Sequence, residues 1–317
     1  MVERRLSGAS STVTLPVSSF SPTPEGLLRQ VLDPPHHPLW LGALDHYEVL
    51  ALLGAGGMGL VLRARDARNG ASVAIKMIHP GLAWDPAACQ RFLREARHMQ
   101  RLHHPNILPV LDVAEHPCGP YFVMPCIAEG SLSQRIQPGK PLDDRFILQV
   151  ARQIASAVAC AHRHGIIHHD LKPGNVLLDG RPHPFLTDFG LARTVFNETV
   201  AHLEAERRVG TAPYMSPAVA AGEMEDTRCD IYSFGALLYE MLTGSPPYRG
   251  ETAEEILGKI LAGPPPSIGE LDPSASTGLV TVAEAAMARA IRDRYASMVD
   301  VVADLERVAA GEAPRGR

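Results

Sequence analysis

The sequence lacks the features that mark secreted, membrane-spanning or nucleic-acid-binding proteins. Its five cysteines form no CxxC pair and no regular framework, which is typical of reduced thiols in a cytosol. Residues 1–20 have no apolar core of a signal peptide, and no apolar run approaches the roughly 18 residues of a membrane helix. The formal net charge of −5 gives no indication of a nucleic-acid partner. We therefore expect a cytoplasmic protein with no membrane span.

The length and composition are those of a globular protein with an unstructured start. The chain has 317 residues, 45% hydrophobic and 21% charged, which is enough for a core in one large domain or two lobes. Residues 1–45 are rich in Ser, Thr and Pro and are predicted to form a flexible arm. Leucines within 27–32 could form one helical turn, which the following prolines would stop. We expect residues 311–317 to be a disordered tail.

Along the rest of the chain, the predicted secondary structure changes from mainly strands to mainly helices. Short β-type runs dominate before Pro125, at residues 47–53, 60–65, 72–77, 107–114 and 121–124. One helix interrupts them, with Asp85 as N-cap, Pro86 in its first turn and apolar residues at helical spacing (Phe92, Ala96, Met99 and Leu102). After Gly130 the pattern is mainly helical, at about 147–161, 230–243, 280–292 and 298–309.

A glycine-rich loop follows the first predicted strand. Residues 54–61 read Gly-Ala-Gly-Gly-Met-Gly-Leu-Val, which fits GxGxxGxV. Glycines let a backbone approach phosphates, because no Cβ intervenes and the N–H groups stay available. Taken alone, the motif also suits a plain hairpin or a dinucleotide-binding turn. The latter opens a helix at its last glycine, whereas residues 60–62 continue as a strand, which disfavours dinucleotide binding.

A lysine and a glutamate in the first half could form a buried pair. Lys76 ends the strand pattern Val-Ala-Ile-Lys, on the same predicted sheet as the glycine loop. Glu95 lies about one helical turn from Phe92 and from Met99, so it shares the inward edge of its helix. A carboxylate there is costly unless it is paired, and Lys76 is the natural partner. The helix by itself favours a solvated Glu95 instead.

The densest polar cluster reads HHDLKPGN and is followed by an apolar strand and by TDFG (residues 168–175, 176–178 and 187–190). Phosphoryl transfer needs an oriented hydroxyl, neutralised charge and metal ions rather than covalent help from the protein. Asp170 can orient the hydroxyl or accept its proton, and Lys172 can neutralise the γ-phosphate. Asn175 and Asp188 offer the hard oxygen ligands that Mg²⁺ prefers.

A zinc hydrolase is a competing interpretation, because four histidines lie close together in this region: His162, His164, His168 and His169. However, no HExxH arrangement is present. The first two of the four fall at a helix end, where cationic side chains are favourable in any case. We therefore interpret His162 and His164 as surface residues of a helix end.

Taken together, the motifs resemble the bacterial form of the eukaryotic-like (Hanks-type) Ser/Thr protein kinase family. The match spans about residues 47–309, with all motifs in the family's order. The resemblance implies an α+β, two-lobed fold over residues 46–310. It has a small β-rich N-lobe with one helix (46–125) and a larger, mostly helical C-lobe (126–310). It also implies an enzyme that uses ATP and Mg²⁺ to phosphorylate Ser or Thr in protein substrates, and a possible homodimer.

The resemblance carries roles onto matching positions of this sequence. The implied ATP-binding residues are Gly54, Gly56, Gly57, Gly59, Val61, Ala74, Lys76, Met124, Pro125, Ile127 and Leu177. Within this set Met124 is the gatekeeper, and Pro125 and Ile127 offer backbone groups to the adenine. The implied catalytic residues are Asp170, Lys172, Lys76 and Glu95, and the implied metal ligands are Asn175 and Asp188. Asp230 resembles a buried carboxylate that binds the backbone of the catalytic loop.

Two positions depart from the family pattern. His169 replaces an Arg that usually binds a phosphate on the activation loop, and a largely neutral imidazole lacks that bidentate fork. We therefore predict activity without a strict need for loop phosphorylation, for which Thr194 and Thr199 are the candidate sites. Ala218 replaces a Glu that usually pairs with an Arg, which Arg294 resembles. Arg294 then needs solvent or another carboxylate, such as Glu223 or Glu225.

Three functions fit the sequence to different degrees. An active Ser/Thr kinase is favoured, because every residue that the chemistry needs is present. A pseudokinase scaffold is the alternative, supported only by the departures at His169 and Ala218. A small-molecule kinase of similar fold is disfavoured, because the Pro-Tyr-Met-Ser-Pro segment at 213–217 and the helix opened by Asp230 resemble the peptide-binding part of protein kinases.

Overall fold

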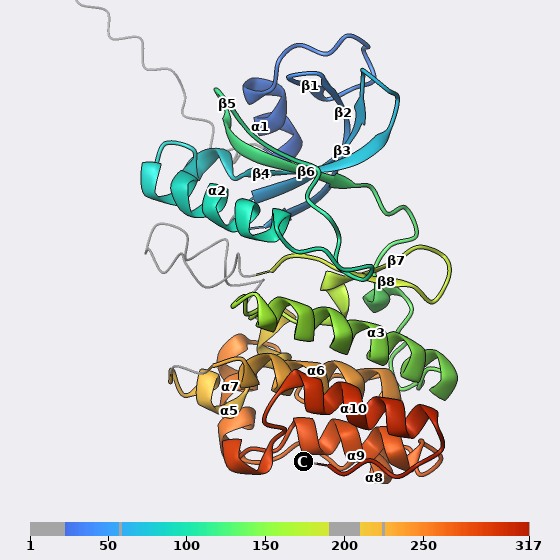
Figure 1. The fold of residues 1–317 in the computed structure, drawn as a ribbon. Coiled ribbons are helices and arrows are strands. Elements are labelled where there is room, and N and C mark those ends of the chain that lie inside the picture. Colours follow the sequence, from blue (N-terminus) through green and yellow to red (C-terminus); the bar gives the residue numbers. More distant parts are fainter. Residues whose placement is uncertain (1–22, 57–58, 190–209, 224–225, 317) are drawn as a thin grey trace, which may run out of the picture.

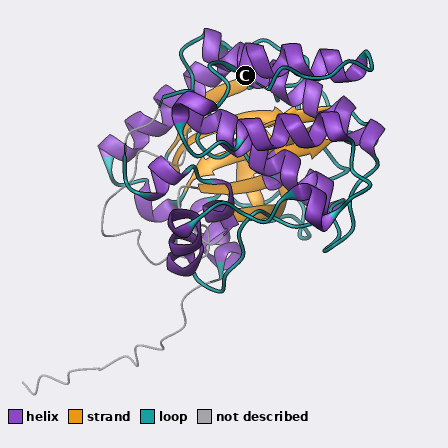
Figure 2. Cartoon of the chain, turned by 90° about the horizontal axis from the view of Figure 1, so that it is seen from below, coloured by secondary structure: helices purple, strands orange, loops and turns teal. Residues whose placement is uncertain are grey.

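The chain folds into two stacked lobes (Figure 1). The structure, a computed structural model, describes residues 23–56, 59–189, 210–223 and 226–316. Within them, the large sheet belongs to one lobe and most helices belong to the other. Seen from the helical end, the helices of the larger lobe lie in front of the sheet (Figure 2). This arrangement confirms the predicted α+β, two-lobed fold.

The small lobe is built on one six-stranded sheet in the order β1-β2-β3-β4-β6-β5, with every neighbouring pair antiparallel. Its strands are β1 (Gly42–Leu44), β2 (Tyr47–Gly56), β3 (Gly59–Asp66), β4 (Ser72–Ile78), β5 (Asp112–His116) and β6 (Gly119–Pro125). The strand predicted over 107–114 is wrong in its first half, since β5 begins only at Asp112. Ile107 and Leu108 are instead buried in the connection, where the Leu108 N–H donates to the Leu186 carbonyl at 2.9 Å.

The one helix expected within the sheet region is α2 (Pro86–Gln100). Asp85 caps it by accepting the Ala87 N–H at 2.9 Å, and Pro86 occupies its first turn. Its apolar stripe faces the sheet, where the rings of Phe92 and Phe122 lie 5.5 Å apart. The predicted amphipathic helix is therefore confirmed, and it places Glu95 on its partly buried edge.

Residues 23–45 are not the flexible arm that the sequence predicted. They form α1 (Pro24–Val31), whose N-cap Thr23 accepts the Gly26 N–H, and the edge strand β1. Leu28 and Leu32 are 0% and 8% exposed, within the apolar cluster on the sheet face that includes Val49, Leu62 and Tyr121. The helix ends before Pro34, as expected, but burial of its leucines outweighs the Ser/Thr/Pro composition.

The larger lobe surrounds the buried helix α6. Its helices are α3 (Asp144–Arg163), α5 (Pro217–Ala220), α6 (Arg228–Thr243), α7 (Ala253–Ala262), α8 (Ile268–Leu271), α9 (Thr277–Ala286) and α10 (Met298–Ala309). A two-stranded sheet, β7 (Val176–Leu178) with β8 (Pro184–Leu186), lies on the side of the small lobe. Among the described helices, none is long and apolar enough to cross a membrane.

Two predictions at the end of the chain are wrong. The helix expected over 280–292 is α9, which ends at Ala286, and Ile291–Asp293 form a separate 3-10 turn. The expected disordered tail is tied down in its described part, because the carboxylate of Asp304 accepts the N–H groups of Arg315 and Gly316 at 2.9 and 2.8 Å. Burial would raise the pKa of Asp304, but these hydrogen bonds lower it.

Candidate active site

One carboxylate on α6 anchors the loop of residues 168–175. Asp230 is 0% exposed, and its oxygens accept the backbone N–H groups of His168 at 2.7 Å and of His169 at 2.8 Å. His162 Nε2 lies 2.8 Å from the same carboxylate. Burial alone would raise the pKa of Asp230, but the hydrogen bond from His162 and the interactions with His168 lower it. The predicted role of Asp230 as a buried carboxylate under the loop is confirmed.

The surface assignment of His162 is wrong. Its side chain is only 11% exposed and serves as a partner of Asp230. His164 is exposed at the end of α3, as expected. Within the described part of the chain, no group of three or more His, Cys, Asp or Glu residues could hold a metal ion, so the histidines form no zinc site there. The sequence could not reveal His162, because its partner lies 68 residues further on.

His168 connects the loop to the segment that carries Asp188. Its Nε2 lies 3.0 Å from the carbonyl oxygen of Thr187, and its Nδ1 accepts the Asp170 N–H at 3.3 Å. Its ring lies 4.5 Å from that of Phe189. Burial lowers the pKa of His168, so the imidazole is neutral and donates to Thr187 from Nε2. The two polar segments of the sequence therefore meet through this ring.

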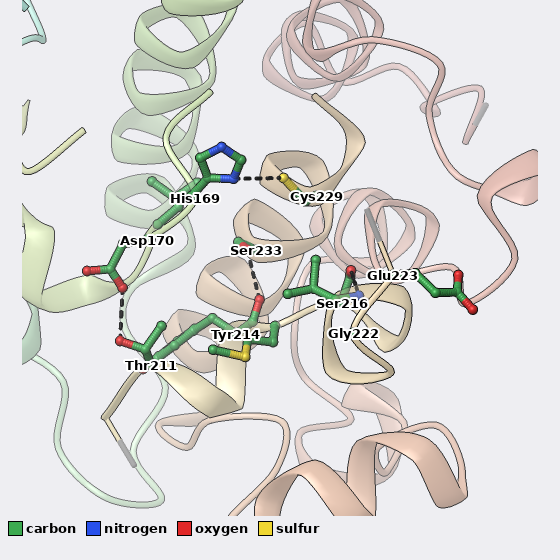
Figure 3. A pocket seen from close by; sticks show the side chains of 12 residues that line it. His169, Asp170, Thr211, Tyr214, Ser216, Gly222, Glu223, Cys229 and Ser233 are labelled. Carbon is green, nitrogen blue, oxygen red and sulfur yellow. Dashed lines mark hydrogen bonds between the residues drawn. The ribbon is translucent and has the colours of Figure 1, made fainter. Parts of the chain in front are cut away.

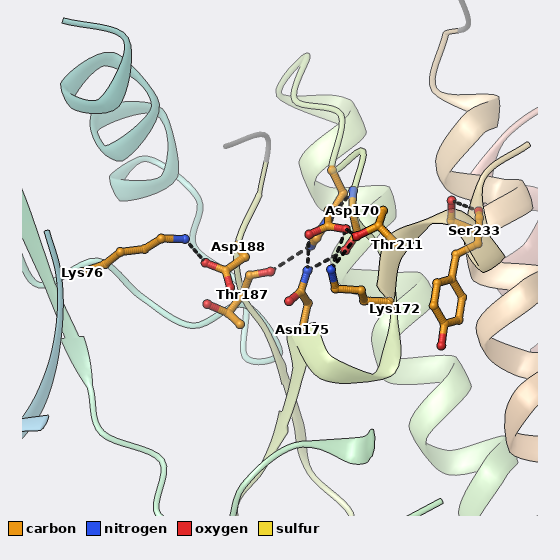
Figure 4. A network of polar contacts seen from close by, with 10 residues as sticks. Lys76, Asp170, Lys172, Asn175, Thr187, Asp188, Thr211 and Ser233 are labelled. Atoms are coloured by element: carbon orange, nitrogen blue, oxygen red, sulfur yellow. Dashed lines mark hydrogen bonds and ion pairs between the residues drawn. The ribbon is translucent and has the colours of Figure 1, made fainter. Parts of the chain in front are cut away.

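Asp170 is held by three side chains (Figure 4). Its Oδ1 accepts from Lys172 Nζ at 3.0 Å and from the Thr211 hydroxyl at 2.9 Å, and its Oδ2 accepts from Asn175 Nδ2 at 3.0 Å. Lys172 also donates to the Thr211 hydroxyl at 2.7 Å. The carboxylate is 97% buried yet fully partnered, so its orientation is fixed before any substrate arrives. Thr211, 41 residues further along the chain, is thereby part of the site.

Asn175 and Asp188 have the chemistry of magnesium ligands. The amide nitrogen of Asn175 donates to the carbonyl and the carboxylate of Asp170, at 2.6 and 3.0 Å, which leaves its amide oxygen directed away from them. The Asn175 carbonyl accepts the Thr187 N–H at 3.0 Å, so the two segments run side by side. The donor set of one carboxylate and one amide oxygen fits a small hard cation that keeps most of its waters.

Lys76 pairs with Asp188 across the two lobes (Figure 4). Its side chain is 9% exposed, whereas that of Asp188 is 27% exposed. The predicted pair between Lys76 and Glu95 is not formed in this conformation, although both residues are described. In this structure Asp188, from the larger lobe, is the partner of Lys76 instead.

The residues expected around the adenine come from four separate segments that pack on the main apolar core. Ala74 and Met124 face each other in the register of β4 and β6, and both belong to the main apolar core. Three further residues are partly buried against the same core: Val61 on β3, Ile127 in the connector that follows β6, and Leu177 on β7. Pro125 ends β6 at the start of that connector. Their assignment to an adenine site stays a prediction.

The glycines of the glycine-rich loop differ in how much space a side chain would have at each position. Nothing lies within 4 Å of a Cβ built on Gly54, and one on Gly56 would meet only the Gly59 carbonyl at 3.9 Å. A Cβ on Gly59, by contrast, would overlap the carbonyl oxygen of Met77 on β4. Gly54 and Gly56 thus leave backbone open to a ligand, while Gly59 is required by strand packing. Gly57 lies outside the described residues.

Comparison with known proteins agrees with this geometry. The protein kinase domain family matches residues 47–275. The chain belongs to the protein kinase family. The serine/threonine-protein kinases PknB of Mycolicibacterium smegmatis and of Mycobacterium tuberculosis are each 35% identical to it over 274 residues, which are 85% of this chain and 44% of theirs. This places the kinase among the bacterial Hanks-type serine/threonine kinases. It also means that the chain spans less than half the length of these relatives.

Solved structures give the same family. The crystal structure of the PknI kinase domain of Mycobacterium tuberculosis has a TM-score of 0.64 to this kinase and 25% sequence identity. The match covers 84% of this chain and 96% of that one.

A further sequence relative, a probable serine/threonine-protein kinase of Corynebacterium efficiens, is 35% identical over 270 residues. These are 83% of this chain and 41% of the relative.

Within the described residues, Arg294 has backbone and aromatic partners. Arg294 is 4% exposed, and its guanidinium donates to the carbonyls of Ala288 at 3.0 Å and Arg228 at 2.8 Å. The guanidinium carbon Cζ of Arg294 also lies 5.1 Å from the ring centre of Tyr232. Of the proposed carboxylate partners, Glu225 lies outside the described residues, as do the candidate phosphosites Thr194 and Thr199.

Proposed function

We propose that this kinase transfers the γ-phosphoryl group of ATP to Ser or Thr hydroxyls of protein substrates. The observation that carries the proposal is the fixed carboxylate of Asp170, held by Lys172 and Thr211 and joined through Asn175 to the Asp188 segment. Asp170 would accept a hydrogen bond from the substrate hydroxyl and take its proton as the hydroxyl oxygen attacks the γ-phosphorus, while the bond to the β–γ bridging oxygen breaks and ADP leaves. Lys172 would offset charge on the transferred group.

The nucleotide would lie between the lobes. Val61, Ala74 and Leu177 would enclose the adenine, Met124 would close the back of its site, and Pro125 and Ile127 would offer backbone groups. Gly54 and Gly56 would let backbone N–H groups approach the phosphates, helped by Gly57 and Gly59. Mg²⁺, when bound, would neutralise phosphate charge and orient the γ-phosphate. Asn175 and Asp188 would hold it with one amide and one carboxylate oxygen.

Nucleotide binding would rearrange the lysine. Asp188 cannot serve both Lys76 and a metal ion at full strength, since both compete for the same carboxylate. We propose that Lys76 then moves to the α- and β-phosphates and that Glu95 becomes its partner through a shift of α2. The kinase domain would extend over residues 46–310, with residues 23–45 attached to its small lobe.

The proposal for the cellular setting rests on the sequence and on the family. We propose protein substrates in the cytoplasm and a homodimer as a possible assembly. His169 cannot offer the bidentate fork of an arginine, so activity would not strictly require phosphate on Thr194 or Thr199. A pseudokinase that binds nucleotide without transfer is the alternative. The complete set Lys76, Asp170, Asn175 and Asp188 disfavours it.

The experiment is a phosphoryl-transfer assay with radiolabelled ATP and a generic basic protein substrate. Wild type should label Ser and Thr of the substrate, while Asp188→Ala should not. Asp179→Ala is the matched control, because Asp179 is exposed and its carboxylate only accepts the Arg181 N–H at 3.2 Å. Absence of label from wild type, together with retained ATP binding, would instead establish the pseudokinase.

A further inference from the structure

A cavity of about 260 Å³ opens beside Asp170, on the side away from Lys76 (Figures 3 and 4). Its walls are formed by the loop of residues 168–175, by the separate segment 211–216, by α5 and by the start of α6. The lining is largely apolar and includes Leu171, Tyr214, Met215 and Val219. Because Asp170 itself lines the cavity, a group bound there lies next to the carboxylate that would receive the substrate hydroxyl.

A thiol and an imidazole face each other in the wall of this cavity (Figure 3). Cys229 Sγ, on the first turn of α6, lies 3.7 Å from His169 Nδ1 and 3.9 Å from Asp230 Oδ1. His169 has a left-handed backbone, with φ of 63°, which the bond from its N–H to Asp230 holds in place. The ring therefore points at α6, and both residues line the cavity although Cys229 is only 5% exposed.

We propose that Cys229 is a reversible thiolation site for low-molecular-weight disulfides. His169 Nδ1 accepts the thiol proton while Cys229 Sγ attacks one sulfur of the disulfide. The new S–S bond forms as the old one breaks, and the leaving thiolate takes the proton from His169 and departs as a thiol. The disulfide is the oxidant, so the step needs no other reagent, and an excess of thiol reverses it.

The attached group would occupy the cavity next to Asp170. This consequence rests on the proposed function, because it concerns access of a protein substrate. The nucleotide residues Lys76 and Asp188 lie on the opposite side of Asp170 from Ser233, which also lines the cavity (Figure 4). Thiolation would therefore block phosphoryl transfer to protein while leaving nucleotide binding in place.

The chain contains a matched control thiol. Cys160, on α3, is 4% exposed, almost the same as Cys229, but it does not line the cavity and its side chain has no imidazole partner in the described part. Cys126 lies in the connector beside the nucleotide residues, so its reaction would change ATP binding. Peptide mapping by mass spectrometry reports each of these thiols separately.

The test treats the full chain with hydroxyethyl disulfide at neutral pH and follows peptide masses, ATP binding and substrate phosphorylation together. Cys229 should react at least about tenfold faster than Cys160, and His169→Asn should slow Cys229 by about tenfold or more. Phosphorylation should fall with the extent of Cys229 modification and return with dithiothreitol, at unchanged ATP affinity. In Cys229→Ser the ratio of treated to untreated activity should stay near one.

Equal rates at Cys229 and Cys160 in the folded chain would overturn the site. Modification of Cys229 with full retention of phosphorylation would overturn its effect on the substrate. If untreated protein transfers no phosphate at all, the proposed function has failed, and the peptide masses still decide whether Cys229 is the thiolation site.

Discussion

Lys76 reaches across the lobes to Asp188, while Glu95 on α2 is not its partner in the described contacts. The lysine and the proposed metal ligand therefore form an ion pair in this structure. Because Mg²⁺ and ATP compete for these same two groups, we expect Glu95 to matter for turnover with nucleotide bound. Glu95→Gln should lower kcat/KM for ATP by about 10²-fold, the typical effect of a misplaced positioning group. Steady-state kinetics measure it, with exposed Glu254→Gln as the control.

The hydroxyl of Thr211 is the second testable group. It joins Asp170 to Lys172, so Thr211→Val should lower kcat by about 10²-fold, as loss of one preorganised donor does. Thr211→Ser keeps the hydroxyl and should recover most of the activity. Equal losses in the two variants would assign Thr211 a packing role instead.

Asp170 itself gives a sharper result. Asp170→Asn keeps the shape and one acceptor oxygen but removes the group that takes the proton. We expect kcat to fall by about 10²–10⁴-fold, with ATP affinity within about twofold of wild type. Equilibrium ATP binding beside the transfer assay separates the two quantities. A variant with wild-type turnover would exclude Asp170 as the base.

The buried His168 predicts a pH dependence of stability. Burial lowers the pKa of its imidazole in the folded state, so below about pH 6.5 the unfolded chain binds a proton that the folded chain does not. Folding stability should therefore fall as the pH drops through this range. His168→Phe keeps the ring near Phe189 but cannot titrate. Between pH 7 and 5.5, wild type should lose about 1 kcal/mol more of its unfolding free energy than the variant, by urea titration.

A substitution at Leu28 measures how much the packing of α1 contributes to the free energy of unfolding. Leu28 is 0% exposed within the small-lobe cluster, so Leu28→Ala should destabilise the protein by about 2–5 kcal/mol. Leu39→Ala, at a side chain 80% exposed, is the control and should change stability by less than about 0.5 kcal/mol. Denaturant unfolding compares the two. Similar values would show that α1 contributes nothing to the lobe.

The identity of the site residues was easier to predict from the sequence than the partners that these residues contact. Short motifs marked Lys76, Asp170, Asn175 and Asp188, because the chemistry of phosphoryl transfer restricts residue type within a few positions of the chain. The partner of Lys76 could not be predicted in the same way. It depends on where α2 and the larger lobe sit relative to each other, which is a tertiary property.

The same distinction explains the errors in the fold. His162 looked like a surface residue, since its partner Asp230 is remote in sequence. Residues 107–111 had strand-like composition because they are buried in a connection, and burial and sheet pairing favour the same apolar residues. The helix α1 was missed because composition favoured disorder, whereas contacts with the distant sheet decide the outcome.

The last glycine of the glycine-rich loop has a consequence for genetic screens. Gly59 lies against the carbonyl of Met77, so any side chain there pushes β3 away from β4. Loss-of-function alleles at this codon would be attributed to a nucleotide defect, although the lesion is in the sheet. Alleles at Gly54, where a side chain meets nothing within 4 Å, would report on the proposed nucleotide site instead.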